Sequence, residues 1–298
     1  MTSAYIITGP TSGYGYRTAL ELAKHGTVVL VGRDRTKLDA VAAEIGPGAV
    51  AITCDLSDPA SARRAAAQIV SLQLPIAAVV NNAGVQDFRG SKTPRGWDLT
   101  FATNHLGPFA LTEALIPHLA DGTTVVFVVS AVEDPERKQA KMAGFRGGRY
   151  ISAEASARAE WEPGGAKSAG FDAYATSKQA ALAATLAFAR DVPRLKFIAV
   201  EPGFAAGTGL GRQMPVAVRV LARILFPLVR PLIKGATTPK RASRVIANAA
   251  LNSAGETGVY LDELGEHMRG SAKVHDPAFQ DRVMRETRAF LGQVDVLV

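Results

Sequence analysis

The 298-residue chain has a single cysteine, Cys54, which excludes a disulfide within the chain and indicates a reducing compartment. It has no uninterrupted apolar run of about 18 residues, the length that a membrane-spanning helix needs. No basic leader precedes the first apolar segment, which starts at about Ala4, so a signal peptide is not expected. Together these absences predict a cytoplasmic protein.

Acidic residues are fewer than basic ones, 27 against 34, and the formal net charge is +7. Much of this excess lies in residues 212–234, which contain five basic residues and no acid. No alternation of aromatic and basic residues accompanies them, so a nucleic-acid partner is not expected. Residues 131–170 contain neither histidine nor cysteine, so no metal site is predicted there. His105 and His118 are expected to have structural roles.

Apolar, β-branched segments alternate with helix-length segments from the start of the chain. Strands are predicted at 5–8, 27–32, 49–54, 76–82, 124–130, 196–203 and 258–262. Helices are predicted after the first strand through about His25, after the second through about Ile45, and over 61–72 and 108–120. The alternation has no linker, so it predicts one doubly wound α/β domain over 1–298, with helices on both faces of a parallel sheet.

The segment TGPTSGYG (8–15) lies between the first predicted strand and the first predicted helix. Glycines at such a turn let the backbone approach a pyrophosphate, which the N–H groups of the helix then bind. The candidate cofactor contacts in this loop are Gly9, Thr11, Ser12, Gly13 and Gly15. A tight turn without a ligand is the alternative, and the strand–turn–helix context favours the nucleotide site.

The residue after the second predicted strand lies where the adenosine ribose of a dinucleotide would be. An acid there would hold both ribose hydroxyls and select NAD, whereas the planar guanidinium of Arg33 can pair with a 2′-phosphate. NADP(H) is therefore the favoured cofactor. NAD(H) stays an alternative, because a shift of one residue would bring the carboxylate of Asp34 to the ribose. A solvated surface charge is the other interpretation of Arg33.

The segment YATSK (174–178) lies at the start of a long alanine-rich helical stretch. Tyr174 and Lys178 are four residues apart and share one helix face, where an ammonium favours the ionised phenol. Free tyrosine has a pKa of about 10. Lowering that pKa would let Tyr174 exchange a proton with a carbonyl or alcohol oxygen near neutral pH. A packed tyrosine beside a solvated lysine is the alternative, which the nucleotide loop disfavours.

Four further motifs follow in order: CDL (54–56), NNAG (81–84), TNHLG (103–107) and PG (202–203). With TGPTSGYG and YATSK, they resemble the short-chain dehydrogenase/reductase family over nearly the whole chain. The resemblance is closest to the retinol-dehydrogenase-like branch, through NHLGPFALT (104–112), Arg33 and GVYLD (258–262). It implies a Rossmann fold and hydride transfer between a nicotinamide cofactor and a carbonyl or alcohol.

The resemblance also implies cofactor contacts outside the glycine loop. It assigns Asp55 and Leu56 to the adenine end and Asn82, Ala83 and Gly84 to the cofactor wall. It assigns Pro202, Gly203 and Thr208 to the nicotinamide end. Tyr174 and Lys178 are also implied to contact the cofactor, Lys178 through a ribose. Tyr14 departs from the family pattern, which has a small aliphatic residue between the second and third glycines. This departure is expected to alter packing without removing the turn.

By the same resemblance, Ser130 is the catalytic serine that polarises the substrate oxygen, and Asn104 holds a water between Lys178 and solvent. Ser130 and Tyr174 are 44 residues apart, further than the family usually has, and an insertion at 131–170 accounts for the gap. Three rival serines lie in it, and none is predicted to end a strand: Ser152, Ser156 and Ser168. The insertion is expected to cover the active site or to contact a partner.

Residues 212–234 place apolar side chains at intervals of four, with arginines off that row and prolines that bend or end the helix. Three interpretations stay open: a core-packed helix pair, an apolar lid over the substrate, and a peripheral membrane contact with arginines toward lipid phosphates. The family resemblance suggests the lid. The lid and the membrane contact both predict that the substrate is a small lipophilic carbonyl or alcohol. A homo-oligomer is suggested by the family resemblance alone. An NADPH-binding sensor without turnover and epimerase or dehydratase chemistry on nucleotide sugars are the alternative functions.

Overall fold

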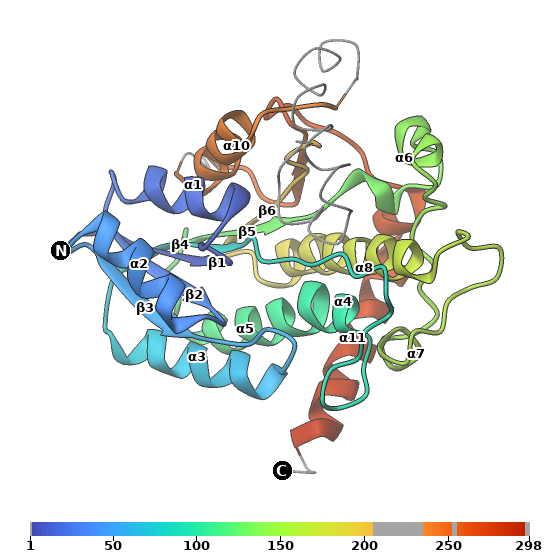
Figure 1. Ribbon diagram of the computed structural model, residues 1–298, viewed down its shortest axis with the longest axis horizontal. Helices are drawn as coiled ribbons and strands as arrows, with labels where there is room; N and C mark the ends of the chain where they lie inside the picture. The colour runs from blue at the N-terminus through green and yellow to red at the C-terminus, as the bar shows by residue number, and fades with distance from the viewer. Residues whose placement is uncertain (1, 205–234, 252–254, 296–298) are drawn as a thin grey trace.

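The computed structural model describes residues 2–204, 235–251 and 255–295, and a parallel sheet forms its centre (Figure 1). The strands are β1 (Ala4–Thr8), β2 (Thr27–Gly32), β3 (Ala49–Thr53), β4 (Ile76–Asn81), β5 (Thr124–Val128), β6 (Lys196–Val200) and β7 (Val259–Leu261). They pair in the order β3-β2-β1-β4-β5-β6-β7. The seven predicted strands are confirmed. Several are shorter than predicted: among them, β5 ends before Ser130 and β6 before Gly203, so both residues lie in loops.

The strands are runs of valine, isoleucine and alanine that are buried on both faces near the middle of the sheet. All five residues of β1 are buried, and Ile6 at its centre is level with Val29 of β2 and Val79 of β4. Continuous apolar runs of this kind suit a sheet that helices cover on both sides. The strand composition therefore accounts for the layered architecture.

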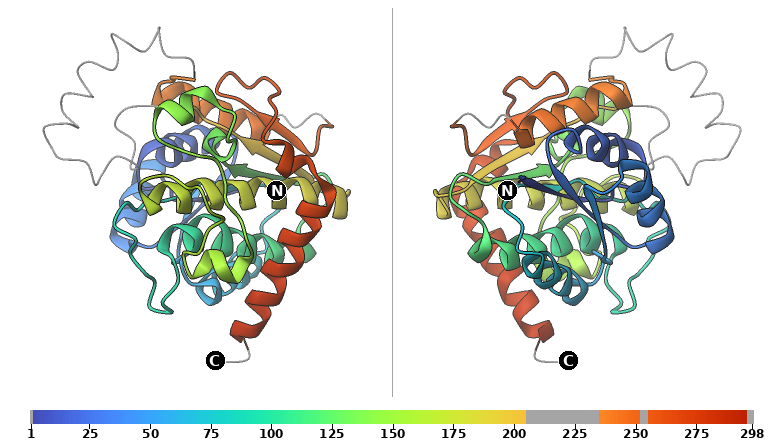
Figure 2. Two further views of the ribbon diagram at one scale, coloured as in Figure 1. Left: turned by 90° about the vertical axis from the view of Figure 1, so that its right-hand side faces the viewer. Right: turned by 90° about the vertical axis from the view of Figure 1, so that its left-hand side faces the viewer.

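Helices cover both faces of the sheet (Figures 1 and 2). On one face lie α1 (Gly13–Leu22), α2 (Arg35–Ile45) and α10 (Pro239–Leu251). On the other face lie α3 (Pro59–Ser71), α4 (Leu99–Phe101), a π-helical turn η1 (Ala102–Leu106), α5 (Gly107–Leu115), a 3-10 turn η2 (Ile116–His118) and α8 (Ala169–Asp191). A second 3-10 turn η6 (Ala272–His275) and α11 (Pro277–Asp295) pack along α8.

The order of the strands reverses between β1 and β4. From β1 the chain proceeds outward through β2 to β3, returns to β4, and then proceeds through β5 and β6 to β7 in the opposite direction. The loops that follow β1 and β4 therefore diverge and leave a crevice at the carboxyl edge of the sheet, where open α/β folds bind ligands. The predicted glycine loop follows β1, and the NNAG segment contains the end of β4.

Residues 131–170 form a folded segment against the body of the protein. They include a 3-10 turn η3 (Ala131–Glu133), α6 (Lys138–Met142) and α7 (Ala153–Ala157). Tyr150 is fully buried and its hydroxyl donates to Glu286 Oε2 of α11 at 2.9 Å. The backbone N–H of Asp98 donates to the carbonyl of Ala157 at 2.7 Å. These contacts fix the segment while it leads the chain from β5 to α8.

The predicted lid, 212–234, and the predicted nicotinamide contact Thr208 lie outside the residues that the structure describes. Among the helices within the described ranges, none is both long enough and apolar enough to cross a bilayer.

Candidate active site

The loop between β1 and α1 depends on its glycines for both conformation and space. Gly9 and Gly13 have φ angles of +68° and +60°, which side chains with a Cβ rarely adopt. Gly15 has an ordinary φ but no room, since a Cβ there would lie 2.2 Å from Gly9 O and 2.3 Å from Asn82 Nδ2. The sequence TGPTSGYG therefore folds as a close turn against the end of β4, as its spacing predicts.

Asn82 and Thr8 hold the ends of β1 and β4 together. Asn82 Nδ2 donates to the Thr8 carbonyl at 2.9 Å, while Thr8 Oγ1 accepts from the N–H groups of Asn82 at 3.0 Å and Ala83 at 2.9 Å. The walls of the crevice are therefore rigidly joined at its base. Asn82 lines the cavity and steadies the sheet, and its contact with a cofactor stays a prediction.

Tyr14 joins the glycine loop to the loop after β6. Its hydroxyl donates to the Gly203 carbonyl at 2.9 Å, across 189 residues of sequence. The departure from a small aliphatic residue thus has a structural consequence that the sequence did not reveal. The tyrosine side chain links two loops that were predicted to contact different parts of the cofactor, the pyrophosphate and the nicotinamide end.

One cavity of about 1200 Å³ lies along this edge of the sheet. The predicted site residues that line it are Gly9, Thr11, Ser12, Gly13, Gly15, Arg33, Leu56, Asn82, Ala83, Gly84, Ser130, Tyr174, Lys178, Pro202 and Gly203. Segments from the first strand to the sixth thus meet in one place. Of the serines in the described part of the chain, only Ser12 and Ser130 line the cavity, so the rivals in the insertion lie elsewhere.

Asp55 and Asn104 are near the cavity without lining it. The carboxylate of Asp55 accepts hydrogen bonds from the N–H and the hydroxyl of Ser57, at 2.9 and 2.8 Å, and so shapes the turn after β3. Asn104 is buried, and its side-chain amide accepts from the N–H of Val85 at 2.8 Å and donates to the Val85 carbonyl at 2.9 Å. It also donates to Ser177 Oγ of α8 at 3.0 Å.

Asn104 lies in the π-helical turn η1, an irregularity typical of functional positions in helices. A Cβ placed on Gly84 would lie 3.4 Å from Asn104 Oδ1 and 3.5 Å from Lys178 Nζ, so both groups flank the same stretch of cavity wall. Asn104 therefore fixes the segment after β4 in front of the lysine.

Arg33 and Asp34, the residues predicted to lie near the adenosine ribose, both line the cavity. Asp34 is the N-cap of α2, and its carboxylate accepts from the backbone N–H of Lys37 at 3.1 Å and from Lys37 Nζ at 2.5 Å. These bonds lower the pKa of Asp34. Lys37 also lines the cavity, which the sequence analysis missed; its position one turn into the helix after Arg33 is the signal.

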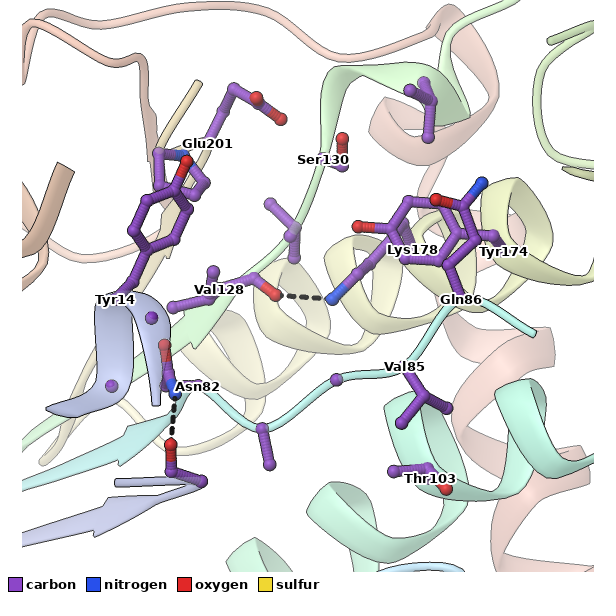
Figure 3. A pocket seen from close by; sticks show the side chains of 18 of the residues that line it. Tyr14, Asn82, Val85, Gln86, Thr103, Val128, Ser130, Tyr174, Lys178 and Glu201 are labelled. Atoms are coloured by element: carbon purple, nitrogen blue, oxygen red, sulfur yellow. Dashed lines mark hydrogen bonds between the residues drawn. The ribbon is translucent and has the colours of Figure 1, made fainter. Parts of the chain in front are cut away.

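Ser130, Tyr174 and Lys178 converge at the other end of the cavity (Figure 3). Ser130 and Tyr174 line the same cavity, so the folded insertion does bring together residues that are distant in sequence. Lys178 Nζ donates to the Val128 carbonyl at 2.8 Å and lies 5.6 Å from the centre of the Tyr174 ring. Tyr174 and Lys178 are 6% and 4% exposed.

The protein groups around Tyr174 raise its pKa above the usual value of 10.0. Burial is the main cause, the Glu201 carboxylate and Tyr14 add to it, and the hydrogen bond with Ser130 opposes it. This net direction is opposite to the lowering that was predicted from Lys178, because desolvation disfavours the ionised phenol. Burial also lowers the pKa of Lys178 to about 8, against a raising effect of Glu201. The phenol is thus held in its protonated form.

Glu201 is the main site residue that sequence reasoning missed. It lines the cavity immediately before Pro202, and it points toward Ser130 in Figure 3. Its carboxylate accepts from the N–H of Ala131 at 2.5 Å and from the N–H of Gly203 at 3.1 Å. An acid directly after an apolar strand, inside the EPG segment, was the available signal.

The insertion forms an apolar wall beside the phenol. Val132, Ala140, Ala143 and Phe145 line the cavity from this segment. The Phe145 ring centre lies 6.3 Å from that of Tyr174 and 4.5 Å from that of Phe171, which packs behind it. Arg137 and Gln139 are polar residues of the same segment that also line the cavity. Residues of the insertion therefore form part of the cavity wall, and its contact with a partner stays a prediction.

Comparison with known sequences identifies relatives of the expected kind. A family model described as short chain dehydrogenase matches residues 3–142. Retinol dehydrogenase 13 of Homo sapiens is 37% identical over 120 residues, which are 38% of this chain and 36% of that protein. A protein assigned as a daunorubicin C-13 ketoreductase, from Streptomyces sp. (strain C5), is 30% identical over 241 residues, 78% of this chain and 75% of that protein. The predicted retinol-dehydrogenase-like resemblance is confirmed over the matched stretch.

Solved structures share the fold over most of the chain. A protein from Mycobacterium paratuberculosis has a TM-score of 0.69 at 25% identity, covering 97% of this chain and 92% of that chain. A 3-ketoacyl-(acyl-carrier-protein) reductase from Brucella melitensis, complexed with NADH, has a TM-score of 0.61 at 24% identity, covering 88% and 96%. A short chain dehydrogenase from Burkholderia cenocepacia, in complex with NADP, has a TM-score of 0.62 at 22% identity, covering 86% and 94%.

Proposed function

The chain belongs to the short-chain dehydrogenase/reductase family, whose members act on CH–OH and C=O groups, and from this we propose that it is an NADP(H)-dependent oxidoreductase acting on a lipophilic carbonyl or alcohol. One observation carries the proposal. A phenol, a hydroxyl and an ammonium from Tyr174, Ser130 and Lys178 meet at one end of a cavity whose other end has a glycine loop and Arg33. Proton exchange and dinucleotide binding are thereby combined in one site.

The residues present fit a dinucleotide. Because Gly15 has no Cβ, the glycine loop can pack closely against Asn82. Helix α1 begins at this loop. A helix N-terminus beside a glycine turn suits a pyrophosphate. When bound, the nicotinamide cofactor supplies or accepts the hydride. The chain's own part is to orient the reactants and to move the accompanying proton.

Tyr174 gives that proton to the carbonyl oxygen during reduction and takes it from the alcohol during oxidation. Ser130 lies beside the phenol and holds the same oxygen, and Lys178 provides the positive charge that tolerates a transient phenolate. Asn104 keeps the segment after β4 in place in front of Lys178. The roles of Tyr174, Ser130 and Lys178 are the ones predicted from the sequence and the family resemblance, whereas Asn104 was predicted to hold a water between Lys178 and solvent.

The preference for NADP(H) is supported by the bonding at the adenosine end. Asp34 is engaged with Lys37 as the cap of α2, and both Arg33 and Lys37 line the cavity. We expect the double substitution Arg33→Ser and Lys37→Ser to raise the Kd for NADPH by about 10–100-fold, because hydrogen bonds to a charged group contribute about 1.5–3 kcal/mol. Isothermal titration of the variant with NADPH and with NADH measures the effect.

Arg35→Ser is the matched control for that titration, because Arg35 pairs with Asp39 at 2.8 Å on α2 and does not line the cavity. The control should leave both affinities unchanged. Equal weakening of NADH and NADPH in the double variant would contradict recognition of a 2′-phosphate and would favour NAD(H).

A lipophilic substrate is supported by the apolar wall of the insertion. We expect Phe145→Leu to raise KM for long-chain or polyene carbonyls about three- to tenfold, because part of the apolar contact is lost, and to leave NADPH affinity unchanged. Phe171→Leu is the control, since Phe171 packs against Phe145 but does not line the cavity. A change of the same size in both variants would indicate general repacking and not substrate contact.

The deciding experiment is NADPH consumption by the purified protein across carbonyl compounds graded from small and polar to long-chain and polyene. Turnover that rises with chain length supports the proposal in full. Turnover only with small polar carbonyls would contradict the lipophilic substrate and keep the reductase. Binding of NADPH without turnover across the series would favour the sensor.

A further inference from the structure

The Tyr14 hydroxyl bridges two loops that are far apart in the sequence. It donates to the Gly203 carbonyl at 2.9 Å, and the tyrosine itself lines the cavity. In Figure 3 its side chain extends from the start of α1 toward Glu201, in the segment after β6. Tyr14 stands between Gly13 and Gly15, which are predicted pyrophosphate contacts, whereas Gly203 is a predicted nicotinamide contact. The hydrogen bond therefore joins the two predicted contact regions of one cofactor.

The glycine-loop end of this bond has little freedom to move. Tyr14 is the second residue of α1, so its backbone is part of a helix. The next residue, Gly15, packs so closely that a Cβ on it would lie 2.3 Å from Asn82 Nδ2. Asn82 in turn donates to the Thr8 carbonyl at the end of β1. The phenol thus extends from a fixed base, and its rigid ring gives the link a fixed length.

At the other end, Gly203 lies in a loop with a demanding conformation. Its φ angle is +76°, and a Cβ there would lie 2.7 Å from the Gly235 carbonyl oxygen and 2.8 Å from Glu263 Cβ. Its N–H donates to the Glu201 carboxylate at 3.1 Å, and the N–H of Phe204 donates to the Gly235 carbonyl at 2.9 Å. These contacts shape the loop, and the tyrosine hydroxyl fixes its carbonyl against the glycine loop.

A small aliphatic side chain, which the family pattern has at this position, cannot form this bond. A tyrosine hydroxyl that is removed from water normally has a hydrogen-bond partner, and the one proton of Tyr14 is used on Gly203. A ligand that contacts both loops binds more tightly when they are already held in the binding arrangement, because less ordering accompanies binding. A ligand that contacts only the glycine loop gains nothing from the bond.

We propose that Tyr14 is a positioning residue for the nicotinamide end of the cofactor: through the Gly203 carbonyl, its hydroxyl holds the loop after β6 at the separation from the glycine loop that a bound dinucleotide requires. The inference rests on the proposed function, since one cofactor must contact both loops. It goes beyond the motif residues, because an aliphatic side chain at this position has no polar role.

The test is Tyr14→Phe, which removes the hydroxyl and keeps the ring. Calorimetric titration measures the Kd for NADPH and for 2′-phosphoadenosine 5′-diphosphate, the fragment of NADPH that ends at the pyrophosphate. We expect the Kd for NADPH to rise about two- to tenfold, the range that one hydrogen bond contributes, and the Kd for the fragment to stay unchanged. A tyrosine that only stabilised the fold would not separate the two ligands.

Tyr16→Phe is the matched control, because its hydroxyl donates to Glu44 Oε1 at 2.7 Å on the exposed side of α1 and it does not line the cavity. Neither Kd should change in that variant. Gly203→Ala perturbs the same bond from its other end, since the added Cβ displaces the loop and its carbonyl. We expect Gly203→Ala alone to raise the Kd for NADPH, and Tyr14→Phe to add less than its own factor in that background, as coupled partners do.

Three results would overturn the proposal in a folded Tyr14→Phe variant, with folding checked by a thermal melt. The first is an unchanged Kd for NADPH. The second is equal weakening of NADPH and of the fragment, which would place the effect in the glycine loop. The third is full additivity with Gly203→Ala, which would mean that the hydroxyl acts elsewhere. A wild type that binds NADPH without turnover contradicts the oxidoreductase and leaves these comparisons intact, so the two failures are distinguishable.

Discussion

Replacing Tyr174 by phenylalanine is expected to lower carbonyl reduction by about 10²–10⁴-fold, the usual contribution of a positioned proton donor. Tyr174 is 6% exposed and lines the same cavity as Ser130, and its ring keeps its packing against Phe145 when the hydroxyl is removed. The variant should therefore fold and bind NADPH as the wild type does. Steady-state NADPH consumption measures the loss of turnover, and a fluorescence titration with NADPH measures binding.

Tyr16→Phe is the matched control for this experiment. Its hydroxyl donates to Glu44 at 2.7 Å on the exposed side of α1, and it does not line the cavity. Turnover should be unchanged. Survival of turnover in Tyr174→Phe would rule out the phenol as the acid/base, whereas the absence of turnover in the wild type itself, with NADPH bound, would favour a sensor.

The layered fold could be predicted because its signals are local. The strands β1, β2 and β4 are short apolar runs that are mostly buried on both faces, and the helices between them have the length of parallel crossovers. The glycine loop was equally predictable, since the positive φ of Gly9 restricts that position to few residue types. Strand ends were less certain: β5 ends at Val128, so Ser130 follows the strand and does not end it.

The electrostatics of the site could not be predicted from spacing. The pair Tyr174 and Lys178 suggested a lowered phenol pKa, whereas burial and Glu201 raise it. Both causes depend on segments that the fold brings from β6 and from the loop after β5, which no local pattern encodes. The apolar wall was hidden for a similar reason, because Phe145 is one of a few large buried side chains within a largely polar and charged insertion.

Substituting Gly15 by alanine is expected to weaken NADPH binding by about 10–100-fold and to lower the free energy of unfolding by about 1–3 kcal/mol, as overpacking does. The added Cβ would lie 2.2 Å from Gly9 O and 2.3 Å from Asn82 Nδ2, so the loop or the end of β4 must move. Either movement disturbs the surface that a pyrophosphate would approach. Calorimetric titration with NADPH and urea denaturation measure the two effects.

Gly292→Ala separates this steric effect from the general effect of replacing a glycine. Gly292 lies in α11, and within the described part of the chain no neighbouring segment comes within 4 Å of the place that a Cβ would occupy. Alanine there should therefore stabilise the helix by up to about 1 kcal/mol and leave NADPH affinity unchanged. If the Gly15→Ala variant bound NADPH as tightly as the wild type, cofactor binding would not depend on the close approach of the glycine loop to Asn82. The predicted pyrophosphate contact would then have to lie elsewhere along the cavity, and the assignment of the glycines would be wrong.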